Sequence, residues 1–135
     1  MTAVLIDSNV LLDVMTDDAR WAPWSSSRLA EAADRSRLVI NPVVYAEISV
    51  RFSRIEDLEA ALEHTPIDRE PIPYEAAFLA GKAFVDYRRR GGRKDAPLPD
   101  FFIGAHAAVA GYTLLTRDAA RYRTSFPKLP LIAPT

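Results

Sequence analysis

Four short apolar runs divide the chain and predict β-strands. The runs cover residues 3–6, 38–40, 113–115 and 129–132. The first three are continuously apolar rather than alternating, which is typical of strands covered on both faces of a parallel sheet. Pro130 cannot donate a backbone hydrogen bond, so the last run is expected at a sheet edge. A fifth, weaker strand signal lies at residues 65–68.

Between these runs, apolar positions recur at helical spacing. The predicted helices cover residues 25–36, 41–53, 53–64, 73–90 and 99–111. Asn41 followed by Pro42 favours a helix start, because the N–H that proline lacks has no partner in a first turn. The last helix is apolar nearly all round and should be buried. Strands that alternate with helices predict an α/β fold, a three-layer α/β/α sandwich around a central parallel sheet of about five strands.

The length and composition place this pattern in one small domain. A chain of 135 residues is most simply a single domain, residues 1–135, and can bury a core without a disulfide or structural zinc. It has no cysteine, which excludes a disulfide framework and a thiolate site and suits a reducing cytoplasm. Its longest apolar tract, residues 101–115, is shorter than the roughly 20 residues that span a bilayer. We therefore expect a soluble cytoplasmic domain with no membrane partner.

Four acidic residues stand out because apolar residues border each of them. Asp7 directly follows the first predicted strand, and Asp118 follows the strand at residues 113–115. Glu47 lies on the helix that leaves the second strand, and Asp100 lies in the first turn of the buried helix. Open parallel sheets place their ligand sites outside the carboxyl ends of the strands, so we expect these four carboxylates to converge there.

Converging carboxylates repel one another unless a cation neutralises them. Hard oxygen ligands favour Mg²⁺ or Mn²⁺ over zinc. Each acid also has an ordinary structural explanation: Asp100 and Asp118 could cap helices, and Glu47 could pair with Arg51 one turn further on. Asp7 is harder to explain in this way, because serine or asparagine would cap equally well without a charge.

The ordered motifs resemble those of PIN-domain ribonucleases, and more closely those of VapC-type toxins of toxin–antitoxin modules. The segments that carry the resemblance are "LIDSNVLLDV", "NPVVYAEI", "LPDFFIGAHAAVAG" and "LLTRDAARYR". The resemblance implies a five-stranded parallel sheet and an RNA endonuclease that depends on Mg²⁺ or Mn²⁺. It further implies a homodimer and inhibition by a small cognate antitoxin, with DNA contacted only through that antitoxin.

The resemblance also assigns roles to individual residues. Asp7, Glu47 and Asp100 match the three core acids that hold the metal, and Asp118 matches a fourth, more variable acidic position. Two further residues, Asn9 and Thr116, match polar positions that support the site. The implied substrate is transfer RNA or another structured RNA whose cleavage blocks translation. His64 and His106 lie in an amphipathic helix end and in the buried helix, so neither is expected to act as a general base.

Basic residues are concentrated late in the chain and suggest a path for RNA. Up to Glu75 there are 14 acidic and 7 basic residues, whereas the remainder has 4 acidic and 10 basic ones. The candidates for phosphate contact are Arg88, Arg89, Arg90, Arg93, Lys94, Arg117 and Arg121. A solvated face, or arginines that complement a helix C-terminus, would explain the same pattern.

Two other functions remain open at this stage. Haloacid dehalogenase-type phosphohydrolases also have an aspartate after the first strand, but they need a second acid where this chain has Asn9. A non-catalytic partner-binding module could use the same scaffold. Trp21 and Trp24, expected between the first two helices, could pack at the edge of the core or form a docking patch for a partner.

Overall fold

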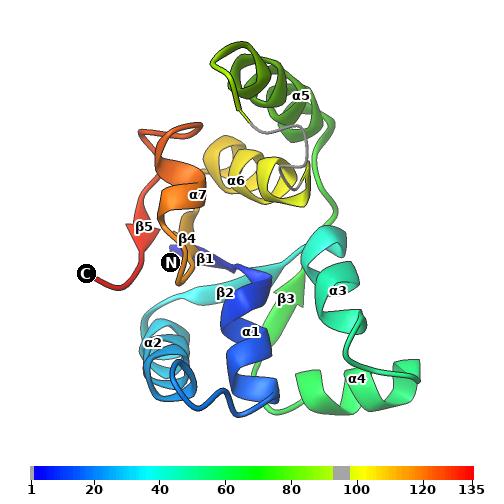
Figure 1. Ribbon diagram of the computed structural model, residues 1–135. Helices are drawn as coiled ribbons and strands as arrows, with labels where there is room; N and C mark the ends of the chain where they lie inside the picture. Colours follow the sequence, from blue (N-terminus) through cyan, green and yellow to red (C-terminus); the bar gives the residue numbers. More distant parts are fainter. Residues whose placement is uncertain (1, 93–97) are drawn as a thin grey trace.

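The computed structural model describes residues 2–92 and 98–135. In this part of the chain, a single parallel sheet of five strands is combined with seven helices, and the strand order is β3-β2-β1-β4-β5 (Figure 1). The strands are β1 (Ala3–Ile6), β2 (Arg37–Ile40), β3 (Ile67–Arg69), β4 (Thr113–Leu115) and β5 (Leu131–Ile132). The helices are α1 (Ser8–Met15), α2 (Ala22–Arg35), α3 (Pro42–Ser49), α4 (Ile55–Leu62), α5 (Tyr74–Arg89), α6 (Leu98–Ala110) and α7 (Ala120–Arg123).

Helices cover both faces of this sheet, so the fold has three layers, as the sequence predicts. Figure 1 shows α1, α2 and α4 on one side of the sheet and α5, α6 and α7 on the other. The central strand β1 pairs in parallel with β2 and β4, and all four of its residues are buried. A strand covered on both faces must be apolar throughout, which explains the uninterrupted run at its start.

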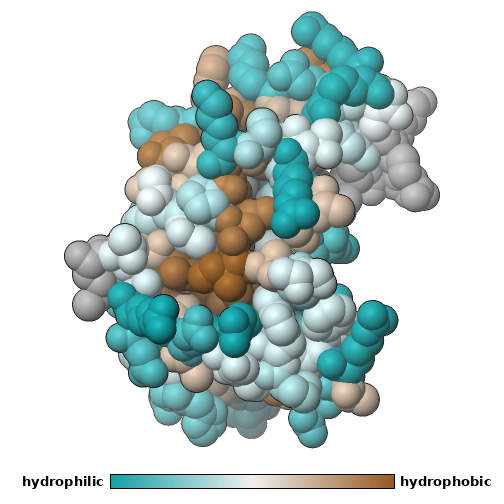
Figure 2. Space-filling model, turned by 90° about the vertical axis from the view of Figure 1, so that its left-hand side faces the viewer, coloured by the Kyte–Doolittle hydropathy of each residue, from teal (hydrophilic) through white to brown (hydrophobic). Residues whose placement is uncertain are grey.

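Both edge strands are short, with three residues in β3 and two in β5. The weak strand signal near residue 67 becomes β3, and β5 is reduced to two residues after Pro130, whose carbonyl accepts from the Leu114 N–H at 3.0 Å. The strand order places β5 at the edge of the sheet, which confirms the position expected from Pro130. Figure 2 shows the face on which β5 lies, where apolar side chains gather near the centre and polar ones surround them.

Two sequence predictions need correction. Trp24 is not in a connection, because α2 begins at Ala22 and only Trp21 precedes it. The two indole rings pack edge to face at 6.1 Å, and Trp24 also packs against the core. The second correction concerns α6, which is buried at most positions up to Ala107 but exposed at 108–110, where its last turn runs out to the surface at Gly111.

Within the residues that the structure describes, no helix combines the length and apolar character needed to cross a bilayer.

Candidate active site at the carboxyl ends of the strands

Asp7 lies where β1 ends and α1 begins. Its backbone N–H donates to the Leu115 carbonyl at 2.9 Å, which extends the sheet by one residue beyond Ile6. Its side chain caps α1, because Oδ1 accepts from the Ser8 N–H at 2.8 Å. A cap is normally solvated, yet Asp7 is only 2% exposed. Capping alone therefore explains the position of this carboxylate but not its burial.

The second carboxylate oxygen of Asp7 is held by three side chains. Oδ2 accepts from the Thr116 hydroxyl at 2.8 Å, from the Tyr122 hydroxyl at 2.8 Å and from the Asn9 amide at 3.4 Å. Burial raises the pKa of Asp7 above its ordinary value, and the hydrogen bonds from Tyr122 and Thr116 oppose that rise. These donors fix the direction of the carboxylate and favour its charged form.

Tyr122 is a site residue that the sequence did not reveal. Its side chain is fully buried, and its pKa is raised first by burial and then by the negative charge of Asp7. The phenol therefore stays protonated and acts as a hydrogen-bond donor to Asp7. The only signal in the sequence is one aromatic residue between two arginines in "ARYR", a pattern that equally fits ordinary packing of a short helix.

Glu47 approaches from α3. Asn41 caps that helix by accepting from the Val44 N–H at 3.0 Å, and Pro42 follows at the first position, as predicted. Glu47 Oε1 accepts from the Ser8 hydroxyl at 2.8 Å, which ties α3 to the start of α1. Burial raises the pKa of Glu47, the bond from Ser8 lowers it, and the charge of Asp7 raises it further. In the described part of the chain, no ion pair joins Glu47 to Arg51.

Asp100 lies in the first turn of α6 and is 7% exposed. Burial is the largest cause that raises its pKa to about 6. Arg121 opposes the shift, whereas the negative charges of Asp7, Glu47 and Asp118 add to it. Because all three other carboxylates act on Asp100 electrostatically, the four acids share one neighbourhood, as their positions in the sequence predict.

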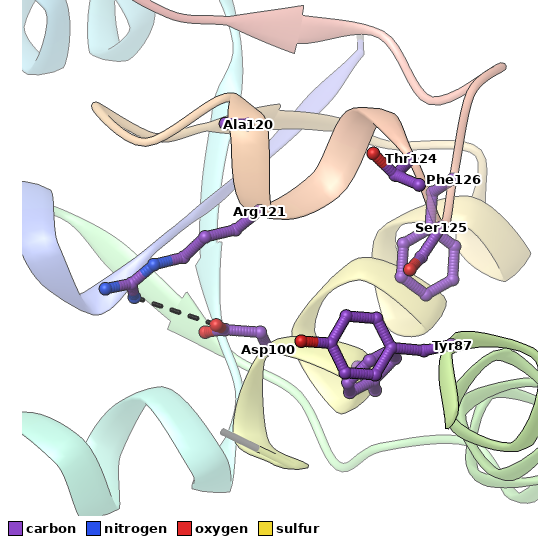
Figure 3. Close-up of a pocket in the computed structure, with 8 residues that line it drawn as sticks. Tyr87, Asp100, Ala120, Arg121, Thr124, Ser125 and Phe126 are labelled. Carbon is purple, nitrogen blue, oxygen red and sulfur yellow. Dashed lines mark ion pairs between the residues drawn. The ribbon is translucent and has the colours of Figure 1, made fainter. Parts of the chain in front are cut away.

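Arg121 lies among these acids. Its Nε is 2.7 Å from Asp118 Oδ2. Its Nη1 is 3.6 Å from Asp100 Oδ2, the ion pair that Figure 3 marks with a dashed line. Asp118 is itself anchored, because its N–H donates to the Thr116 hydroxyl at 3.0 Å. One guanidinium therefore bridges a carboxylate on α6 and another in the loop after β4.

A pocket of about 310 Å³ opens beside the Asp100–Arg121 pair. Figure 3 shows residues of α5, α6, α7 and the segment after α7 around it. The lining residues are Tyr87, Asp100, Phe101, Ala120, Arg121, Thr124, Ser125 and Phe126. Aromatic rings and the hydroxyl groups of Tyr87, Thr124 and Ser125 thus line the pocket that Asp100 borders.

The donor set suits a hard divalent cation, but its present arrangement is not a finished metal site. Carboxylate oxygens are the ligands that Mg²⁺ and Mn²⁺ prefer, and clustered acids with raised pKa values gain most from such a charge. Across residues 2–92 and 98–135, however, no three acidic or histidine side chains stand ready around one metal position. Asp7 is turned toward Thr116 and Tyr122, and Arg121 draws in Asp100 and Asp118.

The basic residues predicted to contact RNA have different surroundings. Arg117 Nε pairs with the buried Asp13 at 2.8 Å, so this arginine has an internal partner. On α5, Arg88 lies over the Phe84 ring, and Arg89 is exposed at the helix end. Arg90 is also exposed there, whereas Arg93 and Lys94 lie outside the described residues.

His106 belongs to a separate polar cluster. It is 1% exposed, its Nδ1 is 3.0 Å from the Asn41 amide nitrogen, and its Nε2 is 3.7 Å from Glu70 Oε1. Burial lowers its pKa, so the ring is neutral at ordinary pH. His64 is exposed after α4.

Comparisons with known proteins agree with this fold. The chain matches the PIN domain family over residues 4–127, and it matches no curated protein sequence. Its structure is similar to VapBC2 from Rickettsia felis bound to a promoter DNA fragment, with a TM-score of 0.77, 16% identity and 98% of both chains covered. It is also similar to VapBC-1 from nontypeable Haemophilus influenzae, with a TM-score of 0.75, 17% identity and 98% of both chains covered. A toxin–antitoxin complex from Klebsiella pneumoniae is similar with a TM-score of 0.66, 20% identity and 98% of both chains covered.

Proposed function

Because this chain belongs to the PIN domain family, we propose that it is an RNA endonuclease that depends on Mg²⁺ or Mn²⁺. The observation that carries the proposal is the meeting of four carboxylates from four segments at one partly buried edge. Burial, together with the charges of the other three acids, raises the pKa of Asp100 to about 6. Excess negative charge at a half-enclosed edge is unfavourable unless a cation, and then a substrate, uses it.

In this proposal the metal is held by Asp7, Glu47, Asp100 and Asp118. When bound, the cation would activate a water molecule and neutralise charge that develops on the scissile phosphate. The hydroxyl groups of Thr116 and Tyr122 fix one oxygen of Asp7 and oppose the rise of its pKa, and the Ser8 hydroxyl holds Glu47. Asn9 also has a supporting role, since its Oδ1 accepts from the Arg117 N–H at 3.3 Å and its amide reaches Asp7.

The RNA path would run from the acids toward the end of α5. Thr124 and Ser125 line the pocket beside Asp100 and also a second hollow, which Arg89 and Arg90 border. The exposed guanidinium groups of Arg89 and Arg90 would bind phosphates of the RNA backbone, and the aromatic rings that line the pocket beside Asp100 would stack on unpaired bases. This arrangement suits a structured RNA with an unpaired segment, such as a transfer RNA loop.

We further propose that the protein is the toxin of a toxin–antitoxin pair and acts in the cytoplasm. The similar structures named above are toxin–antitoxin assemblies, and one of them is bound to promoter DNA. By this analogy the partners are RNA, a small cognate antitoxin and a second copy of the chain, with DNA reached only through the antitoxin. Expression of the chain alone should then arrest growth, and co-expression of the protein encoded beside it should relieve the arrest.

The direct experiment is metal-dependent cleavage of total RNA. The wild-type protein should cleave with Mg²⁺ or Mn²⁺ and stop when a chelator is added. Asp7→Asn and Asp100→Asn should lower the rate at least 100-fold while circular dichroism shows an intact fold, because each removes a charged metal ligand. Asp34→Asn, which changes an exposed acid on α2, is the matched control and should cleave normally.

Two outcomes of this experiment would favour the other functions. A folded protein that neither binds a divalent cation nor cleaves RNA would support a partner-binding module. Release of phosphate from small phosphate esters would support a phosphohydrolase of the haloacid dehalogenase type, although Asn9 stands where that chemistry requires an acid.

A further inference from the structure

Arg121 is the one basic residue in the described part of the chain whose charge lowers the pKa of Asp7, Glu47 and Asp100 alike. Its own pKa is lowered by burial and raised more strongly by Asp100, Asp118 and Asp7. Its guanidinium is therefore the internal counter-charge of the acid site.

The contacts of Arg121 occupy oxygens that a metal would need. Its Nη1 faces Asp100 Oδ2 at 3.6 Å, and its Nε faces Asp118 Oδ2 at 2.7 Å. The Asp100 side chain is only 10% exposed, and the pocket that it lines is also lined by Arg121. A carboxylate oxygen that is turned toward a guanidinium is not turned toward a metal position.

The charge balance points the same way. Four ionised carboxylates and one guanidinium leave a net charge of about −3, which is far from neutral in a partly buried site. A divalent cation offsets more of this charge than the guanidinium does, and it binds oxygen at shorter distances. The arginine is also half exposed, with 49% of its side chain accessible, and it borders the open pocket beside Asp100. It can therefore move away without unfolding a core.

We propose that Arg121 is a built-in counter-ion that competes with the divalent cation for Asp100 and Asp118. In the metal-free protein it holds these two carboxylates, and cation binding releases its guanidinium from Asp100. This inference rests on the proposed metal-dependent function. It also explains why the described residues contain the acids of a metal site without a ready-made ligand cluster.

The test is calorimetric titration of MnCl₂ into the full-length, chelator-treated protein. Arg121→Ala should bind Mn²⁺ on the order of tenfold more tightly than wild type, because the competing charge is gone. Arg121→Lys keeps the charge but loses the two-point contact, so its affinity should lie between the two. Arg123→Ala is the matched control, since Arg123 is exposed on the same helix and forms no ion pair within the described residues.

Three results would overturn the proposal, and they are distinguishable. Equal or weaker Mn²⁺ binding by Arg121→Ala would mean that the arginine assembles the acids rather than competes for them. An equal gain in Arg123→Ala would mean that any nearby positive charge matters, not this contact. Absence of Mn²⁺ binding in every protein, including wild type, would remove the proposed metal function together with this inference. If Arg121→Ala does not fold, the comparison of Arg121→Lys with wild type decides in the same way.

Discussion

Two polar clusters of this protein shift the pKa values of their acids in opposite directions. In the first, Arg37 donates to Asp68 at 3.1 Å and to Glu70 at 2.9 Å, and Tyr112 donates to Glu70 at 2.7 Å. Burial alone would raise the pKa of Glu70, but the bonds from Tyr112 and Arg37 outweigh it and hold that pKa below its ordinary value. We call these residues the balanced cluster.

The acid site at the carboxyl ends of the strands is the opposite case. The pKa values of Asp7, Glu47 and Asp100 are all raised, and burial is the largest cause for each. The balanced cluster stabilises the fold with charges that the chain itself supplies. The acid site lacks enough positive charge of its own, which is what a site for an external cation requires.

The strongest way to break this contrast is to remove the centre of the balanced cluster. Glu70→Ala should lower the free energy of unfolding by about 2–3 kcal/mol, because Arg37 and Tyr112 lose their shared acceptor in a partly enclosed position. Urea denaturation measures the effect. Asp68→Ala removes an acid whose side chain is 57% exposed and should cost less than about 1 kcal/mol. Equal losses from both changes would show that Glu70 is not the centre of the cluster.

Removing a carboxylate charge from the acid site should raise the free energy of unfolding, whereas the same change in the balanced cluster lowers it. Asp100→Asn should raise the metal-free free energy of unfolding at pH 7.5 by about 1–2 kcal/mol, less than the full pKa shift implies, because the pair with Arg121 is lost as well. The raised pKa of about 6 means that the folded carboxyl holds its proton more firmly than the unfolded one. The contribution of Asp100 to the free energy of unfolding is therefore most favourable below its unfolded pKa of 3.8. That stability is lost as the pH rises through the folded pKa of about 6.

Urea denaturation of Asp100→Asn and wild type at several pH values tests this prediction. The advantage of Asp100→Asn over wild type should shrink as the pH falls from 7 and should disappear near pH 4. A variant that is less stable than wild type at neutral pH would contradict the view that Asp100 is held against its preference.

A smaller effect sharpens the role of Tyr122. Tyr122→Phe removes one hydrogen bond to Asp7 while it keeps the buried ring, and should cost about 1 kcal/mol of stability. Because that bond lowers the pKa of Asp7, its loss should also shift the acidic limb of the cleavage profile to higher pH. Tyr45→Phe removes a hydroxyl bonded at 2.7 Å to Glu59, away from the site, and should leave the pH profile unchanged. An unshifted profile in Tyr122→Phe would reduce Tyr122 to a packing residue.

The smallest expected effect concerns the end of α5. Arg89→Ala should weaken RNA binding about two- to threefold and lower the slope of log affinity against log salt by about one, as expected for one lost phosphate contact. Binding measured at several salt concentrations with a chelator present tests this without cleavage. Arg35→Ala, on α2, should change neither value. An unaltered slope in Arg89→Ala would place the RNA path elsewhere.

Much of the fold could be predicted because its signals are local. The uninterrupted apolar run before Asp7 predicts a buried parallel strand, and Asn41–Pro42 predicts the start of α3 within one residue. The helix predicted at residues 25–36 leaves Trp24 outside it, whereas α2 begins at Ala22 and has Pro23 in its first turn, where proline is well tolerated.

The acid site was only partly accessible from the sequence. Asp7 and Asp118 are candidates because they follow strands, Asp100 because it lies in a first helical turn, and Glu47 because its helix leaves the second strand. The Tyr122–Asp7 bond and the Arg121 bridge depend on how α7 packs over α6, and no local pattern encodes that packing. The same holds for Arg117, whose internal pairing with Asp13 joins segments 104 residues apart.

The central claim is that the excess of carboxylates exists to hold a divalent cation, and thermal unfolding with and without MnCl₂ tests it most directly. At a Mn²⁺ concentration of about 100 times the dissociation constant, binding should stabilise wild type by about 2.7 kcal/mol and raise its melting temperature by several degrees. Asp7→Asn and Asp100→Asn should show little or no rise. Identical melting curves of wild type with and without millimolar Mn²⁺ would contradict the account.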